Sequence, residues 1–139
     1  MKNNRRQRGF TLIELLVVLT ILALLAALVV PRVFRNLDKA KINTTKAQIS
    51  ALESALGAYR IDVGSFPTTD QGLQALRIRP SGTENWDGPY LPKEVPLDAW
   101  GHPYVYRCPS EHGDYEIISY GADGREGGEG IDQDIVSWK

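Results

Sequence analysis

The sequence contains a single cysteine, Cys108. One cysteine cannot form a disulfide within the chain, so an exported domain has to be stabilised by other means. A bridge between two copies through Cys108 is one alternative. We expect burial instead, because a free cysteine behaves as a small apolar side chain.

Candidate catalytic groups are also scarce. Cys108 and His112 are four residues apart but fall in a predicted turn, and His102 is the only other histidine. Zinc usually needs three or four protein ligands at characteristic spacings, and a cysteine nucleophile needs a base that a third group orients. The sequence has no glycine-rich phosphate loop followed by Lys and Ser or Thr. We therefore predict that the protein is not an enzyme.

The chain lacks an excess of either charge, with a formal net charge of −1 at pH 7. No strong overall field is available to attract nucleic acid or an anionic membrane. We predict no nucleic-acid partner.

Charge is almost absent from residues 10–30, where Glu14 is the only ionisable side chain. A helix of this length spans about 30 Å, the thickness of one hydrocarbon core. The preceding residues carry basic side chains and no acid: Lys2, Arg5, Arg6 and Arg8. Basic flanks favour the cytoplasmic side of a membrane. We predict a single-pass protein whose C-terminal part lies outside the cytoplasm.

A secretory signal is the main alternative for this segment, because Ala26 and Ala27 could form a small-residue cleavage site. The apolar run is too long for such a signal, it contains Glu14, and a small residue, Gly9, precedes it. We therefore predict cleavage after Gly9 on the cytoplasmic side. Residues 1–9 would then be a leader, and the apolar segment would stay on the mature protein.

Glu14 is costly in lipid, since a carboxylate at the centre of a membrane helix costs about 2.5–3.5 kcal/mol. A helix N-terminus favours negative charge, so an interfacial acid that reaches water is one explanation. Cleavage after Gly9 offers another, because it creates an α-amino group on Phe10, one helical turn from Glu14. In a staggered bundle each Glu14 could pair with the amine of a neighbouring copy. That pairing would set the axial register of an assembly.

Residues 8–18, Arg-Gly-Phe-Thr-Leu-Ile-Glu-Leu-Leu-Val-Val, resemble the class III signal of type IV pilins and pseudopilins. The resemblance implies that a prepilin peptidase cleaves after Gly9 and methylates the new N-terminal Phe10. It places the conserved glutamate of these families at Glu14 and their helix-kinking proline at Pro31. Proline removes a backbone hydrogen bond and bends a helix. Phe10, Glu14 and Pro31 are therefore the implied assembly residues.

Beyond Pro31 the helical period continues, with residues at spacings of three and four: Ile42, Thr45, Ile49, Leu52, Leu56, Tyr59 and Val63. Such spacing predicts one face of an amphipathic helix. Gly64 is the expected C-cap, and Pro67 prevents the helix from resuming. We predict one helix over residues 10–63, bent at Pro31, whose amphipathic half (31–63) covers a globular domain formed by residues 64–139.

Thr69 or Asp70 is predicted to cap a short helix that runs to Arg77. The aromatic residues of the next loop are expected to pack over the long helix: Trp86, Tyr90 and Trp100. A sugar-binding or peptide-binding groove is the alternative role for these rings.

Two predicted strands, 104–107 and 115–120, flank a turn at residues 110–114 and indicate a β-hairpin. A third strand is predicted at 135–138. We expect an α+β fold in which a small antiparallel three-stranded sheet packs on the long N-terminal helix. The resemblance to type IV pilins implies the same architecture.

Four stretches of the C-terminal half resemble the general secretion pathway protein G family, the major pseudopilins of type II secretion: residues 66–76, 88–91, 96–104 and 119–124. Ala99 departs from the proline that the family usually has before the tryptophan. The resemblance implies a structural subunit that is anchored in the inner membrane and polymerises in the periplasm to help drive folded exoproteins across the outer membrane. The implied partners are copies of itself, minor pseudopilins, the prepilin peptidase, the inner-membrane assembly platform and the cytoplasmic ATPase.

Two other functions stay open. The chain could be a type IV pilin for adhesion, motility or DNA uptake, although a surface pilin more often has a pair of cysteines. It could also be a membrane-anchored binding module that never polymerises.

An acidic, glycine-rich loop is expected between the last two strands, at residues 123–134. It contains five acids: Asp123, Glu126, Glu129, Asp132 and Asp134. Repulsion among them favours an open loop unless a cation binds, and Ca²⁺ takes six to eight oxygen ligands from carboxylates and carbonyls. The spacing does not match an EF-hand. A calcium site and a solvated acidic turn are both consistent with this composition.

The resemblance to the protein G family implies that the loop binds Ca²⁺. The implied ligands are the carboxylates of Asp123, Asp132 and Asp134 and the backbone carbonyls near Tyr120 and Arg125. The two late acids are separated by one residue, so which of them binds directly stays open. We expect the ion to stabilise a domain that has no disulfide.

Overall fold

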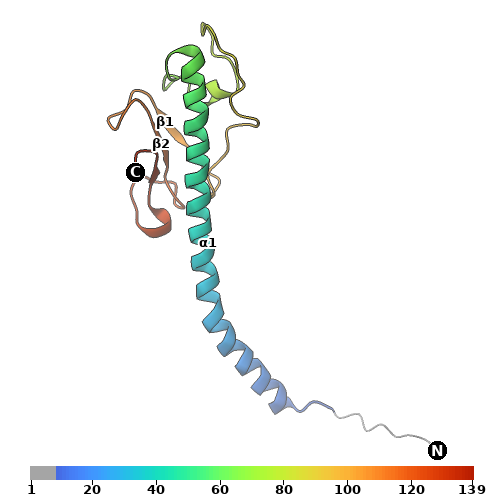
Figure 1. Ribbon diagram of the computed structural model, residues 1–139. Coiled ribbons are helices and arrows are strands. Elements are labelled where there is room, and N and C mark those ends of the chain that lie inside the picture. The colour runs from blue at the N-terminus through green and yellow to red at the C-terminus, as the bar shows by residue number, and fades with distance from the viewer. Residues whose placement is uncertain (1–8) are drawn as a thin grey trace, which may run out of the picture. The chain divides into compact units, whose positions relative to one another are not determined.

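The computed structural model describes residues 9–139, so the predictions for the basic leader residues lie outside the described part of the chain. Its contacts divide the chain between Leu37 and Asp38 into two compact units. The elements are helix α1 (Leu12–Val63), 3-10 helix η1 (Leu73–Leu76), strand β1 (Val105–Arg107), strand β2 (Glu116–Ser119), 3-10 helix η2 (Gly130–Asp132) and strand β3 (Ile135–Val136). Figure 1 labels α1, β1 and β2.

Helix α1 begins two residues later than predicted, because Thr11 caps it. The Thr11 hydroxyl oxygen accepts a hydrogen bond from the backbone N–H of Glu14 (3.2 Å), and the Thr11 carbonyl accepts one from Leu15 (3.2 Å). The first bond satisfies one of the N–H groups that a helix start leaves free. The predicted C-cap is confirmed: Gly64 adopts φ +91°, and its N–H donates to a carbonyl of the last turn (2.8 Å).

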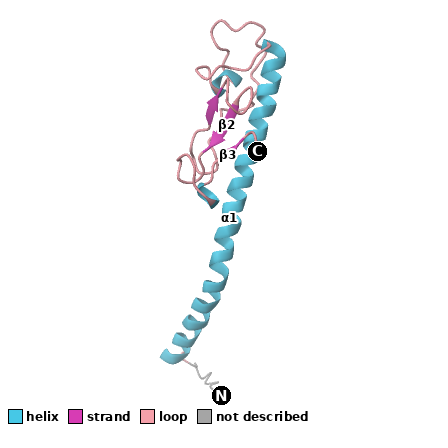
Figure 2. Cartoon of the chain, turned by 90° about the vertical axis from the view of Figure 1, so that its left-hand side faces the viewer, coloured by secondary structure: helices cyan, strands magenta, loops and turns pink. Residues whose placement is uncertain are grey.

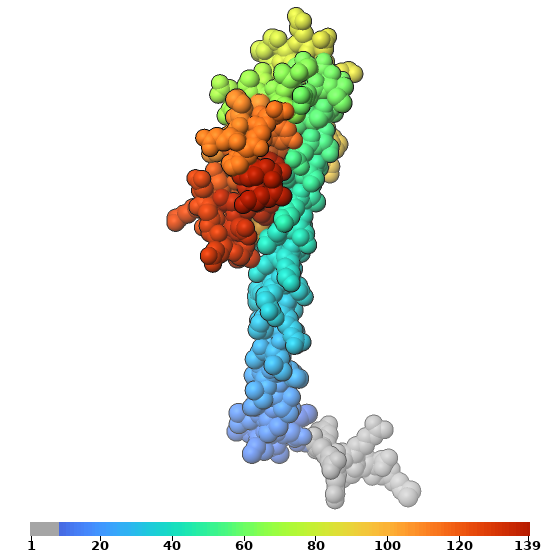
Figure 3. Space-filling model, turned by 60° about the vertical axis from the view of Figure 1, so that its left-hand side comes forward, coloured from blue at the N-terminus to red at the C-terminus, as the bar shows by residue number. Residues whose placement is uncertain are grey.

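In the first unit α1 is apolar, and no other part of the described chain covers its side chains. Its most apolar window, with a mean hydropathy of 3.0 over 18 residues, contains no buried residue. Figure 3 shows the side chains of this segment, in blue, uncovered on the face in view. Length and composition suit a membrane span. Pro31 lies inside the helix, and the bend expected there stays a prediction.

In the second unit α1 supplies one wall of the hydrophobic core. Its buried residues recur at helical spacing: Thr45, Ile49, Leu52, Ala55, Leu56 and Tyr59. The predicted apolar stripe is therefore confirmed, and its outer members Ile42 and Val63 lie against the edge of the core. Leu76 of η1 packs into the same cluster and has no exposed surface.

The three strands form an antiparallel sheet in the order β1-β2-β3, shown beside α1 in Figure 2. Val105 lies opposite Ile118, which in turn lies opposite Val136. Side chains alternate across a strand, so Ile117 joins the core with α1 while Glu116 and Ile118 face the other side. The predicted α+β fold is confirmed, with strands one or two residues shorter at their ends.

The short helix after α1 differs from the prediction. It is a 3-10 helix with no side-chain cap, so neither Thr69 nor Asp70 has the predicted role. Thr68 and Gln71 close the preceding turn instead: each side-chain oxygen accepts a hydrogen bond from the other residue's backbone N–H (3.0 and 3.3 Å). The Thr69 hydroxyl donates to the carbonyl of Cys108 (3.1 Å). The Thr69 hydroxyl, which was predicted to cap the helix, therefore binds a residue far along the chain instead.

The loop aromatics pack against the core as predicted. The Tyr90 ring meets Tyr59 of α1 edge-on with centroids 5.5 Å apart, and it meets Trp86 at 5.6 Å. Trp86 Nε1 donates to the carbonyl of Ala75 (2.9 Å), and Trp100 lies against the same cluster. These rings therefore add apolar contact area to the core, and the half-buried indole N–H of Trp86 has a hydrogen-bond partner.

Candidate assembly segment and acidic loop

The predicted processing site lies on an exposed stretch before α1. Gly9 and Phe10 lie outside regular secondary structure, and 81% of the Phe10 surface is exposed. A peptidase can bind such backbone without first unfolding a helix. The position therefore suits cleavage after Gly9 and modification of Phe10, which both stay predictions.

Glu14 lies in the first turn of α1 and is exposed. Thr11 and Glu14 have the spacing of a capping box, and the structure shows the bond from the Glu14 N–H to the Thr11 hydroxyl. This spacing could have predicted the cap but was overlooked. Phe10 precedes the cap, so Phe10 and Glu14 of one copy do not share a helical turn.

The acidic loop leaves the sheet after Tyr120 and returns through η2. Gly121 has φ +65°, and a Cβ there would lie 2.8 Å from the backbone of Ile131 and Asp132. Only glycine fits this close approach without a backbone shift. The Ala122 N–H donates to the Ile131 carbonyl (2.9 Å), which ties the two ends of the loop together.

The three predicted carboxylate ligands do not converge. Asp123 Oδ1 accepts a hydrogen bond from the N–H of Arg125 (3.1 Å), and both Asp134 oxygens lie within reach of the Gly127 N–H (3.1 and 3.0 Å). Asp123 is exposed, whereas Asp132 and Asp134 are half-buried. Within residues 9–139, no three His, Cys, Asp or Glu side chains are grouped to hold a metal ion.

The donor chemistry of the loop nevertheless suits Ca²⁺. Asp123, Asp132 and Asp134 offer carboxylate oxygens, and the carbonyls of Tyr120 and Arg125 belong to the same segment. All five are hard oxygen donors, and none is a soft ligand that would favour zinc. Calcium binding by this set stays a prediction.

His102 supports the loop from a neighbouring turn. Its Nδ1 lies 3.1 Å from the carbonyl oxygen of Gly121, which assigns the proton to Nδ1 as donor. The ring also meets Gly124, where a Cβ would lie 3.2 Å from it. The buried Asp98 organises that turn, accepting bonds from the His102 N–H (2.9 Å) and the Ser119 hydroxyl (2.5 Å).

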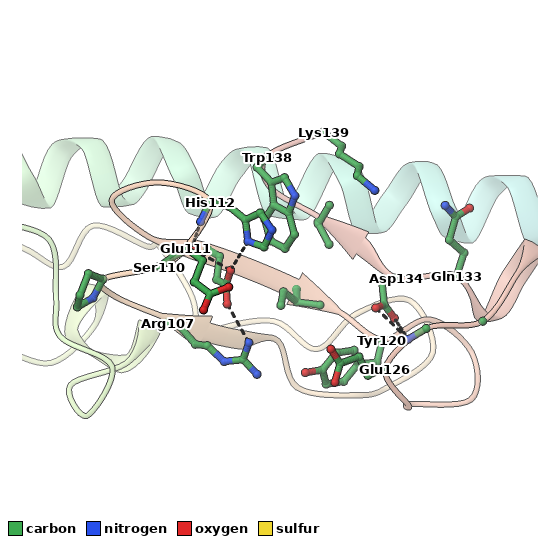
Figure 4. Close-up of a pocket in the computed structure, with 16 residues that line it drawn as sticks. Arg107, Ser110, Glu111, His112, Tyr120, Glu126, Gln133, Asp134, Trp138 and Lys139 are labelled. Carbon is green, nitrogen blue, oxygen red and sulfur yellow. Dashed lines mark hydrogen bonds and ion pairs between the residues drawn. The ribbon is translucent and has the colours of Figure 1, made fainter.

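A second polar cluster lies on the face of the sheet that points away from the core (Figure 4). The Glu116 side chain is only 5% exposed and accepts bonds from Arg107, from the Ser110 hydroxyl and from His112 Nδ1, each at 2.9 Å. These bonds, with that from His112 foremost, hold the pKa of the Glu116 carboxyl below its ordinary value. The cluster lines a pocket of about 540 Å³.

The cysteine and histidine considered as a catalytic pair have separate partners. His112 stacks on Trp138, with ring centroids 3.8 Å apart. Cys108 is half-buried against the core, and its N–H donates to the Thr69 hydroxyl (2.9 Å). The expected burial of Cys108 is thus partial. No sequence signal marked the Glu116 cluster, because its members come from a turn and two strands.

Comparisons with known proteins identify the family. Residues 32–138 match the family described as "Type II secretion system (T2SS), protein G", and residues 4–30 match the "Prokaryotic N-terminal methylation motif". The chain is similar to the type II secretion system core protein G of Pseudomonas aeruginosa, with 46% identity over 137 residues and 96% of each chain covered. It is also similar to the core protein G of Vibrio cholerae, with 45% identity over 141 residues, covering 99% of this chain and 96% of the relative.

A solved structure agrees with this assignment. The fold is similar to that of the major pseudopilin from the type 2 secretion system of enterohaemorrhagic Escherichia coli, with a TM-score of 0.64 and 38% identity. The match covers 74% of this chain and 90% of that chain. Fold, family match and relatives therefore give one answer: the chain belongs to the type II secretion system protein G family.

Proposed function

We propose that this chain is the major structural subunit of a type II secretion pseudopilus. It would polymerise in the periplasm and help to drive folded exoproteins across the outer membrane. One observation carries the proposal: the apolar part of α1 has no buried residue in a single copy, yet the same helix forms a wall of a folded domain further on. Apolar surface of that extent is covered either by lipid or by other copies of the helix.

Processing would convert the membrane precursor into the assembling form. A prepilin peptidase would cut after Gly9 and methylate Phe10, and the exposure of both residues supports this step. Glu14 would then pair with the Phe10 amine of a neighbouring copy. The Thr11 cap favours pairing between copies, because it separates Phe10 from the helix of its own chain. Pro31 would shape the helix that packs in the fibre core.

The mature chain would cross the inner membrane once, with its domain in the periplasm. Its partners would be copies of itself and minor pseudopilins, together with the assembly platform and the cytoplasmic ATPase that power growth of the fibre. Family membership supports these partners as a class. The bare apolar helix supports both membrane storage and packing against identical helices.

The proposal includes a Ca²⁺ ion in the acidic loop. Asp123, one or both of Asp132 and Asp134, and the carbonyls of Tyr120 and Arg125 would hold it. The bound ion would supply positive charge among mutually repelling carboxylates and so close the loop. The ties at Gly121 and His102, which hold the base of the loop, support this role.

The distribution of secreted proteins in a deletion strain tests the proposal. Exoproteins should accumulate folded in the periplasm, and the wild-type gene should restore their export. A copy carrying Gly9→Leu, which the peptidase should not process, should fail to restore it. Normal export in the deletion strain, with loss of surface fibres or of DNA uptake, would show a pilin instead.

A further inference from the structure

Basic side chains follow the apolar segment on the side of the folded domain. We call Arg32 and Arg35 the basic collar; they lie one helical turn apart on α1, and both are exposed. In the part of the chain that the structure describes, the ion pairs involve other residues. Residues 31–41 carry four basic side chains and one acid, Asp38, so the near-zero net charge of the whole chain conceals a local positive segment with a net charge of +3.

The helix turns around the collar are amphipathic. A spacing of three places both residues of the collar on one side of α1. Val33, Phe34 and Leu37 fall on the other side, and their exposed fractions are 49%, 61% and 53%. A helical segment with one basic side and one apolar side is typical of a membrane surface.

The distance from the apolar segment sets the depth of the collar. At about 1.5 Å per residue, Arg32 and Arg35 lie about 3 and 8 Å beyond Val30. The headgroup layer on each side of a bilayer is about 6 Å thick, and the Debye length at 0.1 M salt is about 10 Å. The collar therefore lies within or just outside the headgroups. Lys46 belongs to the folded unit and follows Val30 by sixteen residues in the sequence.

The collar also opposes the signal that orients the chain. The basic leader favours a cytoplasmic N-terminus, while basic residues on the far side of the apolar segment favour the reverse. Cleavage after Gly9 would remove the leader and leave the collar as the main charge beside the span. Because the collar opposes a cytoplasmic N-terminus, we expect it to have a role other than orienting the chain. Binding to an anionic surface would be such a role.

We propose that the basic collar binds the phosphate groups of anionic lipids in the leaflet that faces the folded domain. The proposal rests on the proposed function, because it needs a membrane-anchored subunit. Guanidinium groups bind phosphate through paired hydrogen bonds. An acidic surface on a second copy is the other candidate, but Arg32 and Arg35 lie at headgroup depth, which favours lipid.

Lipid selectivity of the full mature chain tests this inference. The chain is reconstituted in phosphatidylcholine vesicles that contain spin-labelled phosphatidylglycerol or spin-labelled phosphatidylcholine, and electron paramagnetic resonance measures the lipid that each label contributes to the protein boundary. Each basic group at the surface should favour the anionic lipid about fivefold at low salt. The preference should fall towards one at 1 M salt, where the Debye length is about 3 Å.

Matched variants locate the effect. Arg32→Gln with Arg35→Gln should remove most of the preference, whereas Lys46→Gln, an exposed lysine of the folded unit, should leave it unchanged. A chain that floats with vesicles but shows no preference, or a double variant that keeps it, would overturn the inference alone. Failure of the wild-type chain to float with any vesicle would overturn the membrane anchoring as well. Crosslinking of the same double variant separates the other candidate. If the double variant loses its crosslinked oligomers but keeps the lipid preference of wild type, the collar binds a second copy, and the inference is overturned.

Discussion

The Glu14 carboxylate has two expected interactions, one within its own copy and one with a neighbouring copy. At the start of α1, behind the Thr11 cap, it lies in the positive field of the helix N-terminus. In the proposed fibre it would also meet the amine of a neighbouring Phe10. The first interaction stabilises one copy, and the second exists only between copies, so substitutions can separate them.

We predict that Glu14→Ala and Glu14→Gln are processed normally but fail to form fibres, because both remove the charge that pairs with the amine. Thr11→Ala is the matched control: it loses a cap bond worth about 1 kcal/mol but keeps the carboxylate, and it should still assemble. Electron microscopy of sheared fibres measures the outcome. Fibres of normal length from Glu14→Ala would disprove the register role.

Glu116 gives a pH-dependent prediction at the residue scale. Its carboxyl pKa is lowered in the folded protein by bonds from His112, Ser110 and Arg107. The group therefore contributes stability above its unfolded pKa of about 4.3, and this contribution is lost as the pH falls through the lower folded value. We expect Glu116→Gln to melt at a lower temperature than wild type at pH 7, by the equivalent of about 1–3 kcal/mol.

The difference in melting temperature between wild type and Glu116→Gln should shrink as the pH falls below about 4.3, because the unfolded carboxyl is protonated first. It should disappear once the folded carboxyl, whose pKa is lower, is protonated as well. Thermal melting followed by near-ultraviolet circular dichroism at pH 7 and pH 3 measures it. A gap that stays constant between these pH values would show that the charge of Glu116 is not what stabilises the cluster.

At the scale of elements, α1 holds the domain through one buried face. Leu56 has no exposed surface, whereas Ile61, five residues later on the same helix, is 84% exposed. Leu56→Ala should therefore cost about 2–5 kcal/mol of unfolding free energy, while Ile61→Ala should change it by less than about 0.5 kcal/mol. Thermal denaturation of the two variants compares them. Equal losses would mean that this face of α1 is not the wall of the core.

The acidic loop gives a prediction about metal binding. If the proposed site exists, Ca²⁺ should raise the melting temperature of the wild-type domain, because an ion that binds only the folded loop stabilises the folded state. Asp123→Ala should lose most of this rise, whereas Glu129→Ala, an acid outside the expected ligand set, should keep it. Calorimetric titration with Ca²⁺ and Mg²⁺ gives the affinity independently. An equal rise in wild type and Asp123→Ala would remove the calcium site from the account.

Periodicity made the long elements predictable. The spacing of apolar residues gave the buried face of α1, and Gly64 gave its end. The strands were predictable because β-branched and aromatic residues alternate in them. The predicted strand ends differ from the observed ends by one or two residues. The cap at Thr11 was also readable, as a Thr-x-x-Glu pattern, but was overlooked.

Contacts between distant residues were not predictable in the same way. Thr69 was expected to cap η1, but its hydroxyl pairs with Cys108, thirty-nine residues away. The Glu116 cluster and the His102 contact with Gly121 likewise join separate turns and strands. Sequence patterns over a few neighbouring residues do not indicate such pairs, because the two partners become neighbours only in the folded chain.

At the scale of the whole molecule, one helix serves two environments. Within the described part of the chain, residues 9–37 belong to one compact unit, in which α1 is uncovered, and residues 38–139 form another, in which α1 lies in the core. The bare part needs lipid before assembly and identical helices after it. The folded part needs neither. This difference is what the fibre-subunit account explains and a soluble binding domain would not.

Crosslinking in native membranes tests the central claim most directly. An amine-reactive crosslinker applied to cells that express the wild-type chain at native level should give a ladder of bands at multiples of the subunit mass. The Gly9→Leu precursor should give only the monomer. A wild-type chain that stays monomeric while exoproteins are still exported would contradict the account and leave a membrane-anchored module that does not polymerise.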